Sequence, residues 1–116
     1  MSSPETYWRN ALADGRILLQ RATGSGAIFF PPRIMEPGSG DTDFEWVEAS
    51  GLGTVHSVTM INQKPPAAPY NVVLVDLDEG PRLMSRVEGP GEITIGLRVV
   101  ARIEQGEAPT LLFARA

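Results

Sequence analysis

Residues 92–104 read Glu-Ile-Thr-Ile-Gly-Leu-Arg-Val-Val-Ala-Arg-Ile-Glu, and apolar residues alternate with other residues from Ile93 to Ile103. Only Val100 departs from this period of two. Successive side chains of a β-strand point to opposite faces of its sheet, so the pattern predicts a long strand over 93–104. Residues 70–77 form a nearly continuous apolar run, which is typical of a strand buried on both faces. The chain is therefore predicted to be mainly β.

Turn residues separate further extended stretches at 44–48, 54–61, 82–87 and 110–114. This spacing predicts a small barrel or sandwich, and a five-stranded OB-fold barrel fits residues 43–116. Residues 3–14 predict a helix with Ser3 as its N-cap and Pro4 in its first turn. Short strands at 17–19 and 27–30 flank a cluster of turn residues. Together they form a unit with little apolar core of its own. We therefore divide the chain into residues 1–42 and residues 43–116.

Composition excludes several classes of protein. The 116 residues carry a net charge of −4 and include one histidine and no cysteine. Disulfides, thiol catalysis and thiolate zinc sites are thereby excluded. An acidic chain opposes binding to nucleic-acid phosphates, so no nucleic-acid partner is expected, and a single-stranded nucleic-acid-binding OB-fold is the alternative. No apolar run approaches the ~20 residues of a membrane span, and the N-terminus lacks a signal-peptide pattern, so a cytoplasmic protein without a membrane partner is expected.

The sequence offers little support for catalysis. His56 lies within a predicted strand, between Val55 and Ser57. A catalytic histidine needs an orienting partner, so a packed or hydrogen-bonded role is the favoured interpretation. The glycines at 51 and 53 lack the third glycine and the following helix of a dinucleotide loop, and a bend at a barrel corner explains them better. We therefore expect a protein that is not an enzyme.

The chain resembles the DUF35 family, and the likeness covers most of its length. It rests on five stretches: GRILLQR (15–21), AIFFPPR (27–33), EWVEASGLGTVHSVT (45–59), PYNVVLVDLDEGPRLMSRVEG (69–89) and IGLRVVARIE (95–104). The resemblance implies an N-terminal helix, a rubredoxin-like zinc ribbon and an acyl-CoA-associated OB-fold. It also implies a non-catalytic accessory or scaffold subunit that partners a thiolase, a ketoacyl-CoA synthase or a hydratase.

The zinc ribbon is where this sequence departs from the family. The resemblance places the four metal-binding cysteines at Ala22, Ser25, Glu36 and Ser39. Zinc needs four Cys, His or carboxylate ligands, which these residues do not supply. We therefore expect metal-free ribbon hairpins and no cofactor. Packing of the apolar residues 28–30 with the aromatic residues 7 and 8 is one substitute for the metal, and ordering on a partner surface is the other.

Two sets of residues are candidates for binding. Four arginines on two predicted strands could meet the phosphates of acyl-CoA if they share a face; otherwise they form a solvated strand face. Exposed proline-rich loop residues and N-terminal aromatic residues are candidates for contact with a partner protein, although the aromatic residues could instead pack onto the domain. The candidates are Arg82, Arg86, Arg98 and Arg102 for acyl-CoA, and Tyr7, Trp8, Pro65 and Pro66 for a partner.

Overall fold

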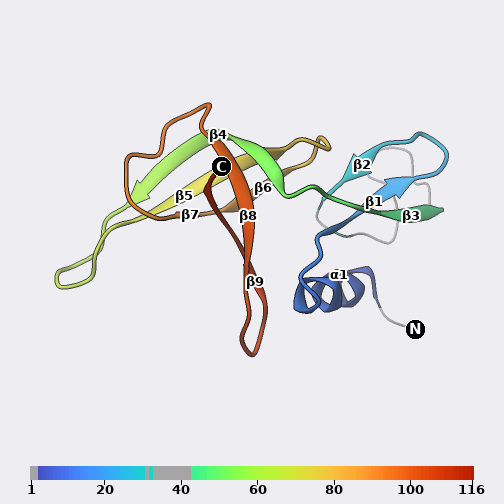
Figure 1. Cartoon of the computed structure of the whole chain (residues 1–116), viewed down its shortest axis with the longest axis horizontal. Helices are drawn as coiled ribbons and strands as arrows, with labels where there is room; N and C mark the ends of the chain where they lie inside the picture. Colours follow the sequence, from blue (N-terminus) through green and yellow to red (C-terminus); the bar gives the residue numbers. More distant parts are fainter. Residues whose placement is uncertain (1–2, 31, 33–42) are drawn as a thin grey trace.

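The computed structural model describes residues 3–30, 32 and 43–116. Figure 1 shows a curled sheet on one side and a helix with three short strands on the other. Within the described ranges, no helix has the length and apolar character needed to cross a bilayer. The elements are α1 (Pro4–Ala13), β1 (Leu18–Ala22), β2 (Ile28–Phe29), β3 (Phe44–Glu48), β4 (Leu52–Ile61), β5 (Tyr70–Leu77), β6 (Arg82–Ser85), β7 (Val87–Glu88), β8 (Arg98–Glu104) and β9 (Thr110–Arg115).

The C-terminal strands form the predicted OB-fold barrel. Their order is β6-β5-β4-β8-β9-β7, with antiparallel neighbours except for the parallel pair β7 and β9. Only Arg86 separates β6 from β7, so the two behave as one strand that changes its partner from β5 to β9. That change closes the sheet on itself. The barrel strands one to five are therefore β4, β5, β6 with β7, β8 and β9, and the OB-fold expectation is confirmed.

The interior of the barrel is filled by the inward-facing residues of these strands. In β5, Val73, Val75 and Leu77 are buried and alternate with more exposed neighbours. Phe113 of β9 is completely buried and is the largest such side chain. Burial of each of these side chains is worth about 1.5–3 kcal/mol, so this core stabilises the barrel without a metal or a disulfide.

The predicted strand at 93–104 begins only at Arg98, so the prediction for residues 93–97 is wrong. Gly96 has a φ of +90°, which turns the chain. The segment instead crosses β4, where the Gly96 amide donates to the Val55 carbonyl and the Val55 amide donates to the Leu97 carbonyl. Ile93 and Leu97 still pack on the core, whereas Ile95 is 71% exposed. The alternation of apolar residues therefore matches burial at residues 93 and 97 of this loop but not at residue 95.

The N-terminal part confirms the helix and corrects one strand assignment. The hydroxyl of Ser3 accepts a hydrogen bond from the Thr6 amide at 3.2 Å, as an N-cap should. β1 pairs with β2 on one edge and with β3 on the other. Phe44–Glu48, which the sequence assigned to the OB-fold, therefore belongs to the sheet of the N-terminal strands. The domain boundary between residues 42 and 43 stays a prediction.

One apolar core continues from the helix and ribbon into the barrel. Leu12, Ile17 and Leu19 belong to the same cluster of buried side chains as Val99 and Phe113. Gly51 makes the close approach possible, since its φ is +86° and a Cβ there would lie 3.3 Å from that of Ala101. In addition, Gln105 Nε2 at the β8–β9 turn donates to the Leu12 carbonyl at 3.1 Å. The two parts are thus packed against each other as well as joined by the chain.

Candidate interaction site

The ribbon turn is closed by hydrogen bonds at the first pair of family cysteine positions. Ala22 is fully buried, its amide donates to the Ala27 carbonyl, and its carbonyl accepts from Gly26. The hydroxyl of Ser25 accepts from the Ala27 amide at 3.2 Å. Glu36 and Ser39 lie outside the described residues. A methyl group at Ala22 offers no ligand, so these residues do not fit a zinc ion.

Aromatic pairs join the helix to the ribbon. The ring of Tyr7 stacks on Trp46 with centroids 4.7 Å apart, and that of Trp8 lies 5.4 Å from Phe30. Sequence reasoning named both helix residues but missed Trp46, because β3 was assigned to the barrel. Tyr7 remains 46% exposed. The helix thus packs on the ribbon through aromatic rings, as one of the two interpretations held.

The other two candidate partner-binding residues, Pro65 and Pro66, lie far from the helix. They belong to the exposed loop between β4 and β5. Figure 1 shows this loop at one end of the longest axis and α1 with the ribbon toward the other end. That axis measures 48 Å. Tyr7, Trp8, Pro65 and Pro66 therefore do not form one surface, and a role for each in partner binding stays a prediction.

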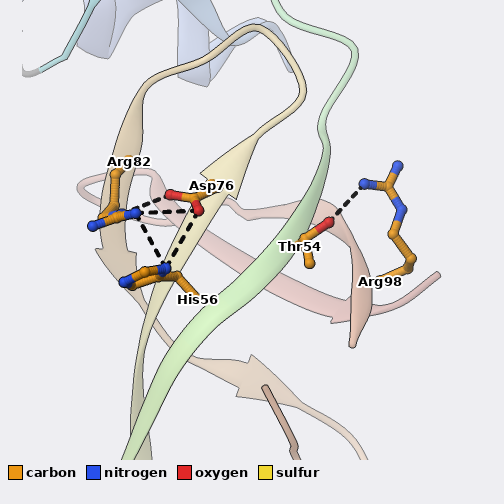
Figure 2. A network of polar contacts seen from close by, with 5 residues as sticks. All are labelled: Thr54, His56, Asp76, Arg82 and Arg98. Carbon is orange, nitrogen blue, oxygen red and sulfur yellow. Dashed lines mark hydrogen bonds and ion pairs between the residues drawn. The ribbon is translucent and has the colours of Figure 1, made fainter. Parts of the chain in front are cut away.

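A row of polar side chains crosses the outer face of the barrel over four strands. Arg98 of β8 is the register neighbour of Thr54, which neighbours Asp76, which neighbours Arg82 of β6. Figure 2 shows Arg82 beside Asp76 and His56, while Arg98 reaches Thr54 from the other side of β4. Arg82 Nε donates to Asp76 Oδ1 at 2.6 Å, and Arg98 Nη1 donates to Thr54 Oγ1 at 2.9 Å. We call these four residues the polar row.

Each arginine of the polar row is held by an aspartate. Arg98 donates through both terminal nitrogens to the Asp78 carboxylate, at 2.8 and 2.9 Å. The hydrogen bond from Arg82 lowers the pKa of Asp76 below its usual 3.8, and that from Arg98 lowers the pKa of Asp78 in the same way. In return, the carboxylates raise the pKa of both guanidinium groups. Both arginines of the polar row are thus neutralised, Arg82 by Asp76 within the row and Arg98 by Asp78 beside it.

His56 joins this row because the β4 strand bulges at its position. The register with β5 shifts between Val55 and Ser57, which leaves the imidazole on the outer face. Its Nδ1 lies 3.1 Å from Arg82 Nη2 and 3.6 Å from Asp76 Oδ2. Nδ1 accepts from the guanidinium in this arrangement, so the imidazole is hydrogen-bonded, as one interpretation of the sequence expected. No nucleophilic side chain contacts it among the residues that the structure describes.

The four candidate arginines do not gather into one cationic face. Arg82 pairs with Asp76, Arg98 pairs with Asp78, and Arg86 pairs with Glu88 at 2.6 Å. Arg102 makes no ion pair within the described part of the chain, and it lines a separate hollow of about 430 Å³ beside Glu88. Contact of these arginines with acyl-CoA therefore stays a prediction.

A second hollow, which sequence reasoning missed, lies at the seam of the barrel. Over the described residues, β6 and β9 share no ladder of hydrogen bonds. Instead the Ser85 hydroxyl donates to the Leu111 carbonyl at 2.9 Å. The side-chain amide of Asn71 both donates to the Val87 carbonyl, at 2.9 Å, and accepts from the Val87 amide, at 2.8 Å. These bonds hold open a hollow of about 550 Å³, which we call the seam groove.

The seam groove is lined by both apolar and charged side chains. Met84 is 70% exposed and Tyr70 is 38% exposed, although both side chains are large and apolar. The groove lies between the second and third barrel strands and the β8–β9 hairpin, on the face that many OB domains use for their ligands. Alternation over 82–86 was the available signal, since it turns Met84 outward beside the buried Leu83. Apolar lining comes from Tyr70, Val72, Met84, Leu111 and Leu112, and polar lining includes Arg86, Glu104 and Thr110.

Comparison with solved structures finds the same architecture in two proteins. One is described as "Ltp2-ChsH2(DUF35) aldolase"; it is 31% identical, covers 99% of this chain and 96% of the other, and superposes with a TM-score of 0.85. The other is a DUF35 protein of unknown function from Sulfolobus solfataricus, 22% identical, covering 96% of this chain and 84% of the other with a TM-score of 0.72. At that lower identity, the second likeness shows the fold alone.

Curated relatives point the same way. A protein of Thermomonospora curvata named "Probable enoyl-CoA hydratase alpha subunit" is 36% identical over 81% of this chain, which spans only 31% of that relative. A "DUF35 domain-containing scaffold protein" of Methanothermobacter thermautotrophicus is 32% identical over 83% of this chain and 77% of its own length. Residues 46–104 match the family described as "ChsH2, C-terminal OB-fold domain". The chain belongs to the DUF35 family and carries an OB-fold of the ChsH2 type.

Proposed function

We propose that this chain is a non-catalytic accessory subunit that scaffolds a complex of acyl-CoA-processing enzymes. The observation that carries the proposal is the likeness to the DUF35 chain of an aldolase assembly, at 31% identity over nearly the full length of both chains. A scaffold-protein relative at 32% identity and the hydratase-subunit relative support the same role. In this proposal the chain contributes a docking surface, and its partner contributes the reacting groups.

The chemistry of the described residues agrees with this assignment. Nucleophilic catalysis needs a nucleophile beside a base that a third group orients. Among the described residues, the hydrogen bond and the ion pair of the His56 imidazole go to a guanidinium and a carboxylate that are already paired with each other. Metal catalysis needs a cluster of ligands, and no three His, Cys, Asp or Glu side chains meet in that way among residues 3–30, 32 and 43–116.

The test is complex formation with an acyl-CoA enzyme. The chain is co-expressed with the thiolase-fold or enoyl-CoA hydratase protein encoded beside it, and the mixture is analysed by size-exclusion chromatography with light scattering. We expect co-elution at micromolar concentration and no turnover of acyl-CoA by this chain alone. Separate elution of the two proteins would contradict the proposal, and turnover by the isolated chain would contradict its non-catalytic part.

A further inference from the structure

We propose that the seam groove is the surface by which this chain holds its enzyme partner. Its occupant is an extended segment of that partner which presents apolar side chains beside a lysine or arginine. The inference rests on the proposed function, because it identifies which part of the accessory subunit makes the contact. Three observations carry it: the exposed apolar lining, the fixed walls and the charged residues of the lining.

The lining is apolar but too open for a small ligand. Sites for small molecules enclose most of the ligand surface, typically 70–90% of it. Met84 is 70% exposed and projects into this groove beside Tyr70. A shallow apolar hollow of about 550 Å³ instead suits side chains from a flat protein surface. Burial of Met84 and Tyr70 by a partner would remove two of the six large apolar side chains that the described residues expose.

The walls of the groove are fixed before any partner arrives. Asn71 holds β7 through two hydrogen bonds, and Ser85 holds β9 through one. Val87, which Asn71 holds, is 3% exposed and belongs to the barrel core. Because ordering of a binding surface costs free energy at the moment of association, a groove held in this way loses little of that energy.

The charged residues of the lining select the chemistry of the occupant. Arg86 is neutralised by Glu88, whose carboxylate lies 2.6 Å away. Glu104 lines the same groove and makes no ion pair within the described part of the chain, and Arg102 lines the adjoining hollow with it. An unpaired carboxylate beside an apolar surface favours a cationic side chain and disfavours a phosphate. The groove therefore fits a basic apolar segment of a protein better than a nucleic acid or the phosphates of acyl-CoA.

The first experiment replaces an exposed apolar side chain of the groove. The affinity of the acyl-CoA enzyme that co-elutes with the wild-type chain is measured by biolayer interferometry for wild type, Met84→Lys and Ile95→Lys. Ile95 is a matched control, since it is 71% exposed but lies in the loop that crosses β4. We expect Met84→Lys to weaken binding roughly tenfold or more, as for a central interface residue, and Ile95→Lys to leave it nearly unchanged. Both positions are exposed, so circular dichroism should report an intact fold for both variants.

The second experiment tests the charge and the identity of the occupant. Glu104→Lys should weaken binding several-fold, and added salt should shrink this loss, whereas Glu107→Lys at the hairpin tip should have little effect. A photo-crosslinking residue, p-benzoylphenylalanine, replaces Met84, and the crosslinked peptide of the enzyme is sequenced by mass spectrometry. We expect an apolar peptide that contains lysine or arginine; an acidic peptide, or a crosslink to bound acyl-CoA, would overturn the assignment.

The outcomes separate this inference from the function on which it rests. If the wild-type chain binds no acyl-CoA enzyme, both statements are wrong. If the wild-type chain binds and Met84→Lys binds equally well, the chain is an accessory subunit that uses another surface, and only the seam groove is wrong. If Ile95→Lys weakens binding as much as Met84→Lys does, the loss reflects added charge on the chain and the groove is again wrong.

Discussion

The barrel and the ribbon are stabilised by different means. In the barrel, β4 pairs over eight positions with β5, and the sheet closes through β7 and β9 around fully buried residues such as Phe113. In the ribbon, β2 has two residues, and ring contacts such as Tyr7 with Trp46 join the ribbon to the helix. The barrel supplies its own core. The ribbon depends on aromatic packing and on its contact with the barrel.

This difference implies that the ribbon is folded only while the barrel is folded. Ile17 and Leu19 of the N-terminal part belong to the same apolar cluster as Val99 and Phe113. In the ribbon sheet β2 has only two residues, and a sheet this short needs a packed apolar face to be stable. We therefore expect one cooperative unfolding transition for the whole chain.

The largest effect is expected from Phe113→Ala in the barrel. The side chain is completely buried, so its truncation leaves a cavity and should lower the free energy of unfolding by about 3–5 kcal/mol. Urea unfolding, followed by far-ultraviolet circular dichroism and by tryptophan fluorescence, measures this loss. Trp8 packs on Phe30 of the ribbon and Trp46 lies on β3, so fluorescence reports on the ribbon. Both signals should shift together.

The matched change in the ribbon is Leu19→Ala. Leu19 is 1% exposed on β1, and its truncation should cost about 2–5 kcal/mol. If the two parts unfold together, this variant also shows coincident transitions by the two signals. A fluorescence transition that precedes the loss of circular dichroism would instead show a ribbon that unfolds alone, and it would contradict the shared core.

A smaller effect is expected from Asn71→Ala at the seam of the barrel. The change removes two hydrogen bonds and leaves the amide and carbonyl of the buried Val87 without their partner. An unsatisfied buried polar group costs about 1–3 kcal/mol, so the free energy of unfolding should fall by that order. Asn10→Ala on the exposed face of α1 is the control and should change it by less than about 0.5 kcal/mol. An equal response of the two variants would show that the seam is held by other contacts.

A smaller loss of stability is expected at acid pH, where the two aspartates that pair with arginines become protonated. Because arginine hydrogen bonds lower the pKa of Asp76 and Asp78 in the folded chain, their contribution to stability is present above pH 3.8. It is lost as the pH falls below 3.8, through the lowered pKa values. The double variant Asp76→Asn and Asp78→Asn should therefore be less stable than wild type at pH 6 and lose less stability between pH 4 and pH 2. Thermal unfolding between pH 2 and pH 6 measures the stability of wild type and of the double variant, with Glu107→Gln as the control.

The sequence predicted the elements of both regions better than it predicted their neighbours. The helix at 3–14 and the strand at 70–77 follow from a cap and an apolar run, which are local signals. The pairing of Phe44–Glu48 with β1 depends on residues more than twenty positions apart, so no local pattern shows it. The same reason explains the candidate sites. Asp76 and Asp78 hold the arginines at positions 82 and 98 across strands, and the seam groove exists only where β6 and β9 diverge.

Removal of metal ions is expected to leave the stability of the chain unchanged. Ala22 offers a buried methyl group where the family has a thiolate, and its amide and carbonyl already pair with Ala27 and Gly26. Incubation with a chelator should therefore leave the unfolding curve of the wild-type chain unchanged, and elemental analysis should find no stoichiometric zinc. The matched variant replaces Ala22, Ser25, Glu36 and Ser39 by cysteine; it should bind zinc, since thiolates at ribbon spacing form a tetrahedral site, and become sensitive to the chelator. A wild-type chain that loses stability with the chelator would show that the ribbon still depends on a metal, and the contrast between ribbon and barrel would then rest on a different ligand set.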